Sequence, residues 1–215
     1  MTPTEREMIY EINRVRSNPK SYLQYISPLL NNAKRQLKIA GRGEKNYSLT
    51  FSTTSLNGKT TKSVDTTWNY ANEEEVRALT TLISDLKKLK VLPVLQPDSG
   101  IYKAAKKHAA DQQAHDWKLL HTGSDGSDPV SRIKLFSPFM KNGNENIGGR
   151  YGYATDTPLD MVLQLLIDAG IPGYGHRYNI LNPHWTHVAC SVEKFKGRTW
   201  WIQNFGAKKK GTVKE

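Results

Sequence analysis

A single cysteine, Cys190, stands in a chain of 215 residues. Neither an internal disulfide nor a cysteine-based zinc cluster can therefore stabilise the fold. The chain must bury an apolar core instead, and its hydrophobic content of 37% is sufficient for one domain of this length. Cys190 alternates with Val188 and Val192, which predicts a buried, unreactive thiol and not a nucleophile.

Hydropathy and charge exclude some classes of protein. No stretch approaches the roughly 20 apolar residues that cross a bilayer, and residues 4–16 are too charged to serve as a signal peptide. The chain holds 31 Lys and Arg against 20 Asp and Glu, a net charge of +11, which favours acidic partners in general. Its lysines are scattered without interleaved aromatic residues, so we expect no nucleic-acid partner.

Apolar residues at helical spacing predict five helices followed by a pair of strands. The first helix begins with a capping box of Thr2 and Glu5 and ends at Asn18-Pro19. A second helix runs to Gly41, and a third begins at Asn72-Glu73-Glu74-Glu75. The remaining predicted elements are helices over 101–117 and 157–168 and strands over 186–193 and 198–204, with a turn at Lys196-Gly197.

Residues 42–71 differ from the rest of the chain. They are rich in Ser and Thr and alternate in a β-like manner around Asn57-Gly58, a dipeptide typical of tight hairpins. One interpretation is a β-hairpin inserted between two helices. The other is a solvated loop with marginal β structure, because an isolated hairpin is barely stable in water.

Four polar residues fall outside the amphipathic patterns. His121 lies in a turn after a helix, Glu145 is bracketed by glycines, Asp168 closes a helix, and His176 follows a glycine. Two imidazoles and two carboxylates can bind a divalent cation, or can pair a general base with its orienting acid. No short metal-binding motif joins them, so unrelated roles in turns remain an alternative at this point.

Other candidates have simpler interpretations. His108 lies on the apolar face of its helix, which favours a core histidine over a ligand. His115 is expected in solvent at a helix end, within reach of a cleft edge, and His187 is a candidate for a cleft wall. Of the adjacent Trp200 and Trp201, we expect one in the core and the other at a surface or an interface.

Several motifs carry a resemblance to a known family. They are Leu92-Pro93-Val94-Leu95, the run 104–109, His121-Thr122-Gly123, Asn144-Glu145-Asn146-Ile147, and the run 175–183. In this order they resemble the CAP superfamily of cysteine-rich secretory, antigen 5 and pathogenesis-related proteins, and above all its bacterial SCP-like extracellular members. The resemblance extends from the first helix to Phe205 and leaves residues 42–71 outside.

The resemblance implies an α+β fold, a three-layer α-β-α sandwich with a small, mainly antiparallel sheet and the inserted hairpin. It implies one domain over residues 1–207, followed by a basic tail over 208–215. The family's cleft residues, His, Glu, Glu and His, fall on the four polar residues above. Asp168 is one methylene shorter than the family's second glutamate, and Asn144 replaces a glycine that is common before Glu145.

The activities that the resemblance implies are divalent-metal binding, lipid or sterol binding, and a disputed proteolysis. We expect an extracellular or cell-surface module whose cleft of His121, Glu145, Asp168 and His176 binds a small, lipid-like ligand or a divalent metal. Zinc or a similar cation would bind His121 and His176. The alternative is a metal-assisted hydrolase in which Glu145 is the base, and His121, Glu145 and His176 are then the catalytic candidates. Binding of a nucleic acid or another polyanion through the basic surface is the third and least favoured hypothesis.

The insertion provides the first testable prediction. Deleting residues 46–66 and closing the gap with a short Gly/Ser linker should change the free energy of unfolding by less than about 1 kcal/mol, because loop-closure entropy depends only logarithmically on length. Thermal unfolding followed by circular dichroism measures this difference. A large fall in the melting temperature would show that the insertion packs against the core.

Overall fold

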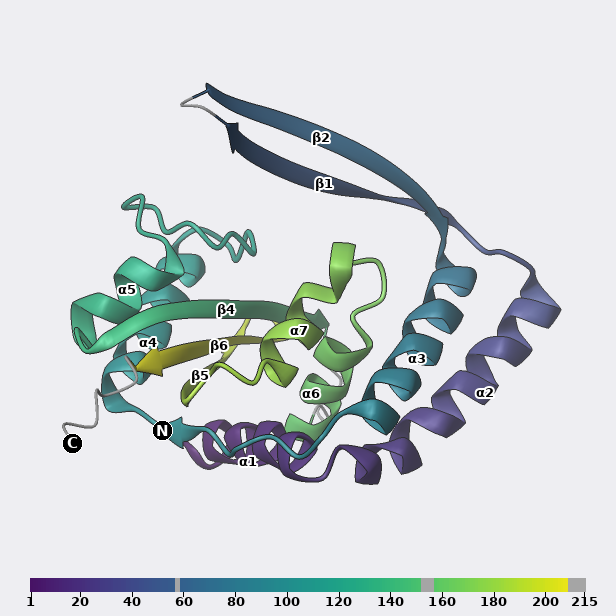
Figure 1. The fold of residues 1–215 in the computed structure, drawn as a ribbon, viewed down its shortest axis with the longest axis horizontal. Helices are drawn as coiled ribbons and strands as arrows, with labels where there is room; N and C mark the ends of the chain where they lie inside the picture. The colour runs from purple at the N-terminus through teal and green to yellow at the C-terminus, as the bar shows by residue number, and fades with distance from the viewer. Residues whose placement is uncertain (57–58, 152–156, 209–215) are drawn as a thin grey trace. The chain divides into compact units, whose positions relative to one another are not determined.

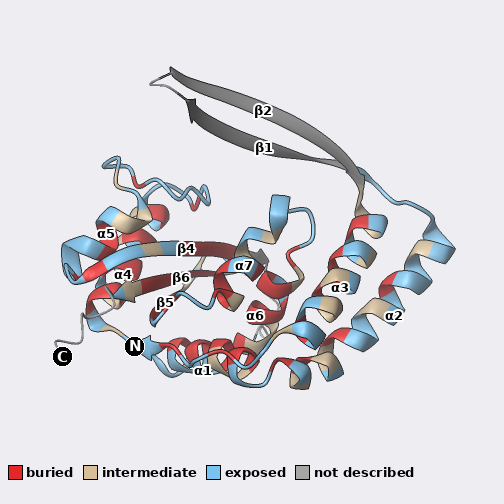
Figure 2. Ribbon diagram, viewed as in Figure 1, coloured by how far each residue is buried: buried red, intermediate tan, exposed pale blue. Residues whose placement is uncertain are grey.

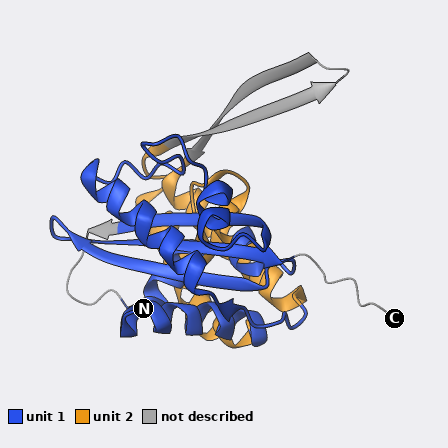
Figure 3. Ribbon diagram, turned by 90° about the vertical axis from the view of Figure 1, so that its left-hand side faces the viewer, with its two compact units in different colours: residues 1–18, 90–165, 178–215 blue, residues 19–89, 166–177 orange. Residues whose placement is uncertain are grey.

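The computed structural model describes all residues except 57–58, 152–156 and 209–215. These described residues form two compact units. Unit 1 comprises residues 1–18, 90–165 and 178–215, and unit 2 comprises residues 19–89 and 166–177 (Figure 3). The single domain expected over 1–207, with a tail over 208–215, stays a prediction.

Unit 1 contains a four-stranded sheet in the order β3-β5-β6-β4. Its strands are β3 (Gln96–Pro97), β4 (Met140–Tyr151), β5 (His187–Phe195) and β6 (Arg198–Lys208). β5 and β6 pair antiparallel, which confirms the expected closing strands, and β6 also pairs antiparallel with β4. Only the short β3 is parallel to its neighbour in this sheet, so the sheet is mainly antiparallel as expected.

Helices cover both faces of this sheet (Figure 1). Ala189 of β5 packs with Ile101 of α4 (Ser99–Ala114) and Ile133 of α5 (Pro129–Phe136). The next residue, Cys190, points to the opposite face because side chains alternate along a strand. That face is covered by α1 (Pro3–Ser17), whose buried Glu5 accepts a hydrogen bond from the β5 backbone at 3.2 Å. The arrangement is the expected α-β-α sandwich.

Because helices cover both faces of the sheet, the expectation that one of Trp200 and Trp201 lies outside the core is wrong. Trp200 and Trp201 point to opposite faces of β6, yet they are only 6% and 0% exposed. Figure 2 shows β6 buried along most of its length. Trp200 packs in the cluster beneath α4, where its ring stacks on Trp117 with centroids 5.1 Å apart. Neither tryptophan is therefore a surface residue.

The ends of α1 and α6 follow the local sequence, and the end of α4 does not. The Thr2–Glu5 capping box forms as predicted at α1, and α6 (Pro158–Ile167) begins one residue after Thr157. α4 ends earlier than expected because Asp116 and Trp117 adopt positive φ angles, which lie outside the right-handed α-helical region. Within the described part of the chain, no helix combines the length and apolar character that a membrane span requires.

Unit 2 is built on two helices, α2 (Leu23–Ala40) and α3 (Ala71–Lys88), that pack against each other. Its other elements are η1 (Pro19–Tyr22), η2 (Pro172–Tyr174), β1 (Lys45–Leu56) and β2 (Lys59–Tyr70). Helix α7 (Gly175–Leu181) begins in this unit. The sequence suggested that Asn72 caps α3, but this residue lies within the helix. Its side chain donates a hydrogen bond to the carbonyl of Gly41 at 3.0 Å.

The expected hairpin is present as a pair of strands. β1 and β2 pair antiparallel over their whole length, from Lys45 opposite Tyr70 to Leu56 opposite Lys59. This pairing favours the hairpin interpretation over the solvated loop. The predicted turn at Asn57-Gly58 lies outside the described residues.

The close contact between β4 and the tryptophans gives a prediction about stability. A Cβ atom at Gly149 would collide with the ring of Trp200, so Gly149→Ala should destabilise the protein by about 1–3 kcal/mol through overpacking. Gly175→Ala is the matched control, because it starts a helix with open space around it and has no positive φ angle. Chemical denaturation measures both, and equal stabilities of the two variants would contradict the packing described here.

Candidate functional site

Glu145 is the central residue of the candidate site in unit 1. It lies on β4, and its side chain is fully buried on the face of the sheet that α4 covers. The two carboxylate oxygens have different partners. Oε1 lies 3.1 Å from Nδ1 of His121 and 3.5 Å from Nε2 of His108, and Oε2 accepts a hydrogen bond from Nη2 of Arg132 at 3.0 Å. A buried carboxylate thus has both a cation and an imidazole beside it, as its desolvation requires.

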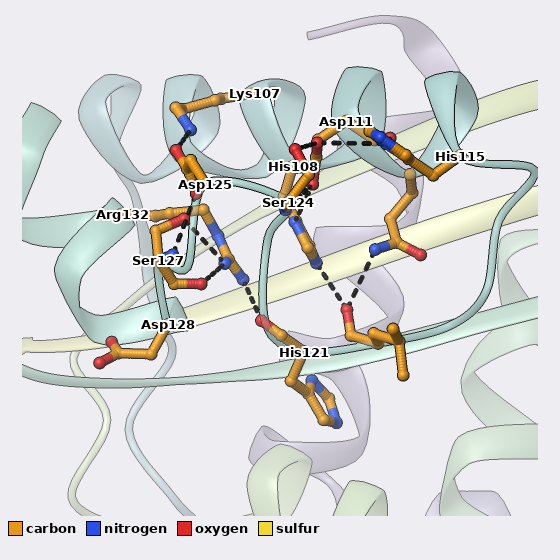
Figure 4. Close-up of polar contacts among 12 residues, drawn as sticks. Lys107, His108, Asp111, His115, His121, Ser124, Asp125, Ser127, Asp128 and Arg132 are labelled. Carbon is orange, nitrogen blue, oxygen red and sulfur yellow. Dashed lines mark hydrogen bonds and ion pairs between the residues drawn. The ribbon is translucent and has the colours of Figure 1, made fainter.

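Arg132 of α5 also holds the loop that carries His121. Its Nη2 donates to the backbone carbonyl of His121 at 2.9 Å, and its Nη1 donates to the carbonyl of Ser127 at 2.6 Å (Figure 4). The side chain is only 1% exposed. The sequence did not predict a role for Arg132. The clue to its burial was its position beside the apolar Ile133 in a short helix.

Further contacts fix the loop against α4 (Figure 4). Lys107 of α4 forms an ion pair with Asp125, and Asp111 accepts a hydrogen bond from the backbone N–H of Ser124 at 2.9 Å. The carboxylate of Asp125 in turn accepts from the N–H of Ser127 at 3.0 Å. Because α4 and α5 both bind this loop, the position of His121 is set by rigid elements.

His108 is the core histidine that its position on the helix predicted. It is fully buried on α4, and its Nε2 faces the carbonyl of Leu120 at 2.9 Å. This contact assigns the proton to Nε2, since a carbonyl can only accept. Burial lowers the pKa of His108 from its ordinary value of 6.5, so the ring stays neutral and supports the segment that leads to His121.

The other two candidates form a pair in unit 2. Nδ1 of His176 lies 2.7 Å from Oδ1 of Asp168, and Oδ2 accepts a hydrogen bond from the backbone N–H of His176 at 2.8 Å. Asp168 follows α6 with a positive φ of 56°, and this turn directs its carboxylate toward the start of α7. The imidazole of His176 is 18% exposed.

Arg177 fixes this pair within unit 2. Its Nη1 donates to the side chains of Thr81 and Asp85 on α3, each at 3.0 Å, and its Nη2 donates to the carbonyl of Ala78 at 2.9 Å. The guanidinium also lies over the ring of Tyr174, 4.0 Å from its centroid. The turn that holds Asp168 and the start of α7 is therefore tied to α3.

The four predicted residues thus form two carboxylate–imidazole pairs, one in each unit. In both pairs the carboxylate faces Nδ1 of the histidine. Among the described residues, no group of three or more His, Cys, Asp or Glu is arranged to hold a metal ion. The shared four-residue cleft, and a metal bound by His121 and His176, stay predictions.

Other sequence candidates lie apart from these pairs. His115 is exposed directly after α4, with Nδ1 facing the carbonyl of Asp111 at 2.8 Å. His187 is buried beside Thr186, 2.8 Å from its hydroxyl, and burial lowers the pKa of this histidine. Cys190 is fully buried, and burial raises the pKa of its thiol far above the usual range, which confirms the expected unreactive role.

Comparisons with known proteins agree with the motifs. The model of the family described as "CAP: Cysteine-rich secretory protein family" matches residues 10–205. Among solved structures, the chain is similar to an outer surface protein of Borrelia burgdorferi, with 20% identity, a TM-score of 0.46, and coverage of 64% of this chain and 95% of that one. It is also similar to an extracellular protein containing an SCP domain from Bacillus anthracis, with 14% identity, a TM-score of 0.45, and coverage of 82% and 71% respectively. Comparison with curated proteins gave no match.

The buried His108 gives a pH-dependent prediction. A histidine whose pKa is lower in the folded than in the unfolded state takes up its proton mainly on unfolding, so stability falls as the pH drops below about 6.5. His108→Gln keeps a donor for the carbonyl of Leu120 but does not titrate. The wild type should therefore lose more unfolding free energy than this variant between about pH 8 and pH 5.

Urea denaturation at several pH values measures the difference. His187 is present in both proteins, so its own titration cancels in the comparison. Parallel pH profiles for the two proteins would contradict a neutral, buried His108.

Proposed function

The chain belongs to the cysteine-rich secretory protein (CAP) family, and on that premise we propose that it is an extracellular or surface module that binds a divalent cation. His121 and His176 are its proposed ligands. Glu145 and Asp168 are positioning residues that orient the two imidazoles. The proposal rests above all on the way in which the buried Glu145 holds an exposed histidine.

The geometry at His121 supports this proposal. Its side chain is 51% exposed, whereas that of Glu145 is fully buried. Because Nδ1 faces the carboxylate, Nε2 is the nitrogen with which the ring can ligate a cation from solvent. A carboxylate behind a histidine is the usual outer shell of a protein metal site, since it fixes the ring and increases its basicity.

Asp168 has the corresponding relation to His176, at 2.7 Å. Two neutral imidazoles oriented by carboxylates are a donor set that zinc accepts, with water or other oxygen donors completing its coordination. The bound cation would supply Lewis acidity. The protein residues would supply the two nitrogens, and Glu145 and Asp168 would each orient the ring of the histidine beside it.

The alternative of a metal-assisted hydrolase with Glu145 as base receives less support. A general base must reach the proton that it removes. The carboxylate of Glu145 is fully buried, with Oε1 facing His121 and Oε2 bonded to Arg132. The geometry therefore favours a positioning role for Glu145, and binding over hydrolysis.

Calorimetry with zinc chloride on the purified chain tests the proposal. We expect the wild type to bind, and either His121→Ala or His176→Ala to abolish the binding heat, because each removes one ligand nitrogen. Asp168→Asn keeps an oxygen acceptor but loses the charge that orients His176, so the affinity should fall by about 10–100-fold.

His115→Ala is the matched control. Its side chain is 51% exposed, the same fraction as that of His121, but it lies near Asp111 and not near Glu145. This variant should bind zinc as the wild type does. Unchanged binding in the variant that lacks both His121 and His176 would overturn the proposal.

A further inference from the structure

Three large apolar side chains are exposed where α5 ends and β4 begins. Leu135 is 65% exposed, Phe136 is 36% exposed and Phe139 is 51% exposed. Single exposed apolar residues are common on protein surfaces, but three in one short turn form a patch that calls for a function. We refer to residues 135–139 as the apolar turn.

Hydrogen bonds hold the apolar turn in place. The backbone N–H of Ser137 donates to the carbonyl of Ile133 at 2.8 Å, and its own carbonyl accepts from the N–H of Met140 at 3.0 Å. The hydroxyl of the buried Ser137 donates to the carboxylate of Asp98 at the start of α4. Because Ile133 and Met140 already fill the core beneath, the exposed rings are displayed by a fixed turn.

Two lysines flank this turn in the sequence, and a third contacts it. Lys134 and Lys141 are both exposed, and Nζ of Lys208 lies 4.9 Å from the centroid of the Phe139 ring. Within residues 129–149 the only acidic side chain is Glu145, which is buried and paired with Arg132. The exposed charges of this segment are therefore all positive.

From this combination we infer that the apolar turn docks the protein on an anionic lipid bilayer. Leu135 and Phe139 enter the boundary between headgroups and acyl chains, and the lysines contact acidic headgroups. Surfaces that bind bilayers from one side combine apolar and cationic residues in this way. The inference does not depend on the proposed cation site.

Charge decides between a bilayer and a second copy of the chain as the occupant. A symmetric dimer through the turn would place Lys134, Lys141 and Lys208 near their own counterparts, in a protein that already carries a charge of +11. An anionic bilayer removes the same repulsion and also accepts the apolar side chains. A soluble polyanion would satisfy the lysines but leave Leu135 and Phe139 without a role.

Sedimentation with lipid vesicles tests the inference. The wild type should bind vesicles of phosphatidylcholine mixed with phosphatidylserine, and bind phosphatidylcholine alone much more weakly. Leu135→Ser combined with Phe139→Ser should weaken binding at least about tenfold, because it removes the inserted apolar area. Lys134→Gln and Lys141→Gln should each weaken it about fivefold, and added salt should reduce binding of the wild type.

Val91→Ser is the matched control, because Val91 is 70% exposed in unit 1 but lies outside the apolar turn. It should bind vesicles as the wild type does, and circular dichroism should show that every variant is folded. Equal vesicle binding by the Leu135→Ser/Phe139→Ser variant would overturn the inference. So would a concentration-dependent dimer that this double substitution abolishes.

Discussion

A carboxylate buried away from water requires a cation beside it, and in unit 1 Arg132 meets this requirement for Glu145. Nη1 and Nη2 of the same guanidinium also donate to the carbonyls of Ser127 and His121, respectively. One arginine therefore balances the buried charge of the sheet and also sets the path of the loop. Removing one partner of such a pair generally costs about 3–5 kcal/mol, because the other charge stays buried.

In unit 2 the buried carboxylate of Asp168 is stabilised by a different kind of group. Asp168 has its carboxylate held by the backbone N–H of His176, at 2.8 Å, and not by a guanidinium. A short side chain suits this arrangement, because the turn after α6 already brings its carboxylate to the start of α7. The carboxylate of Asp168 thus reaches both the backbone N–H and the imidazole of His176.

The sequence predicted the elements whose signals are local. The α1 capping box, the β5–β6 pair and the burial of Cys190 each follow from a few neighbouring residues. β4 was missed because its glycines carry no side chains that would show an alternating pattern. Arg132 was missed because its partner, Glu145, is brought to it only when the sheet and α5 pack together. Which charges are buried together is a property of the packing, so no local pattern contains it.

The stacked indoles lie beside the candidate site. Trp117 belongs to the segment between α4 and His121, and its ring lies nearly parallel to that of Trp200 on β6, with an angle of 8° between the planes. Two aromatic chromophores in such close contact couple their electronic transitions, so their absorption and fluorescence change when the two rings move apart. The spectrum of Trp117 therefore depends on the position of the segment that leads to His121 relative to the sheet, and no added label is needed to follow it.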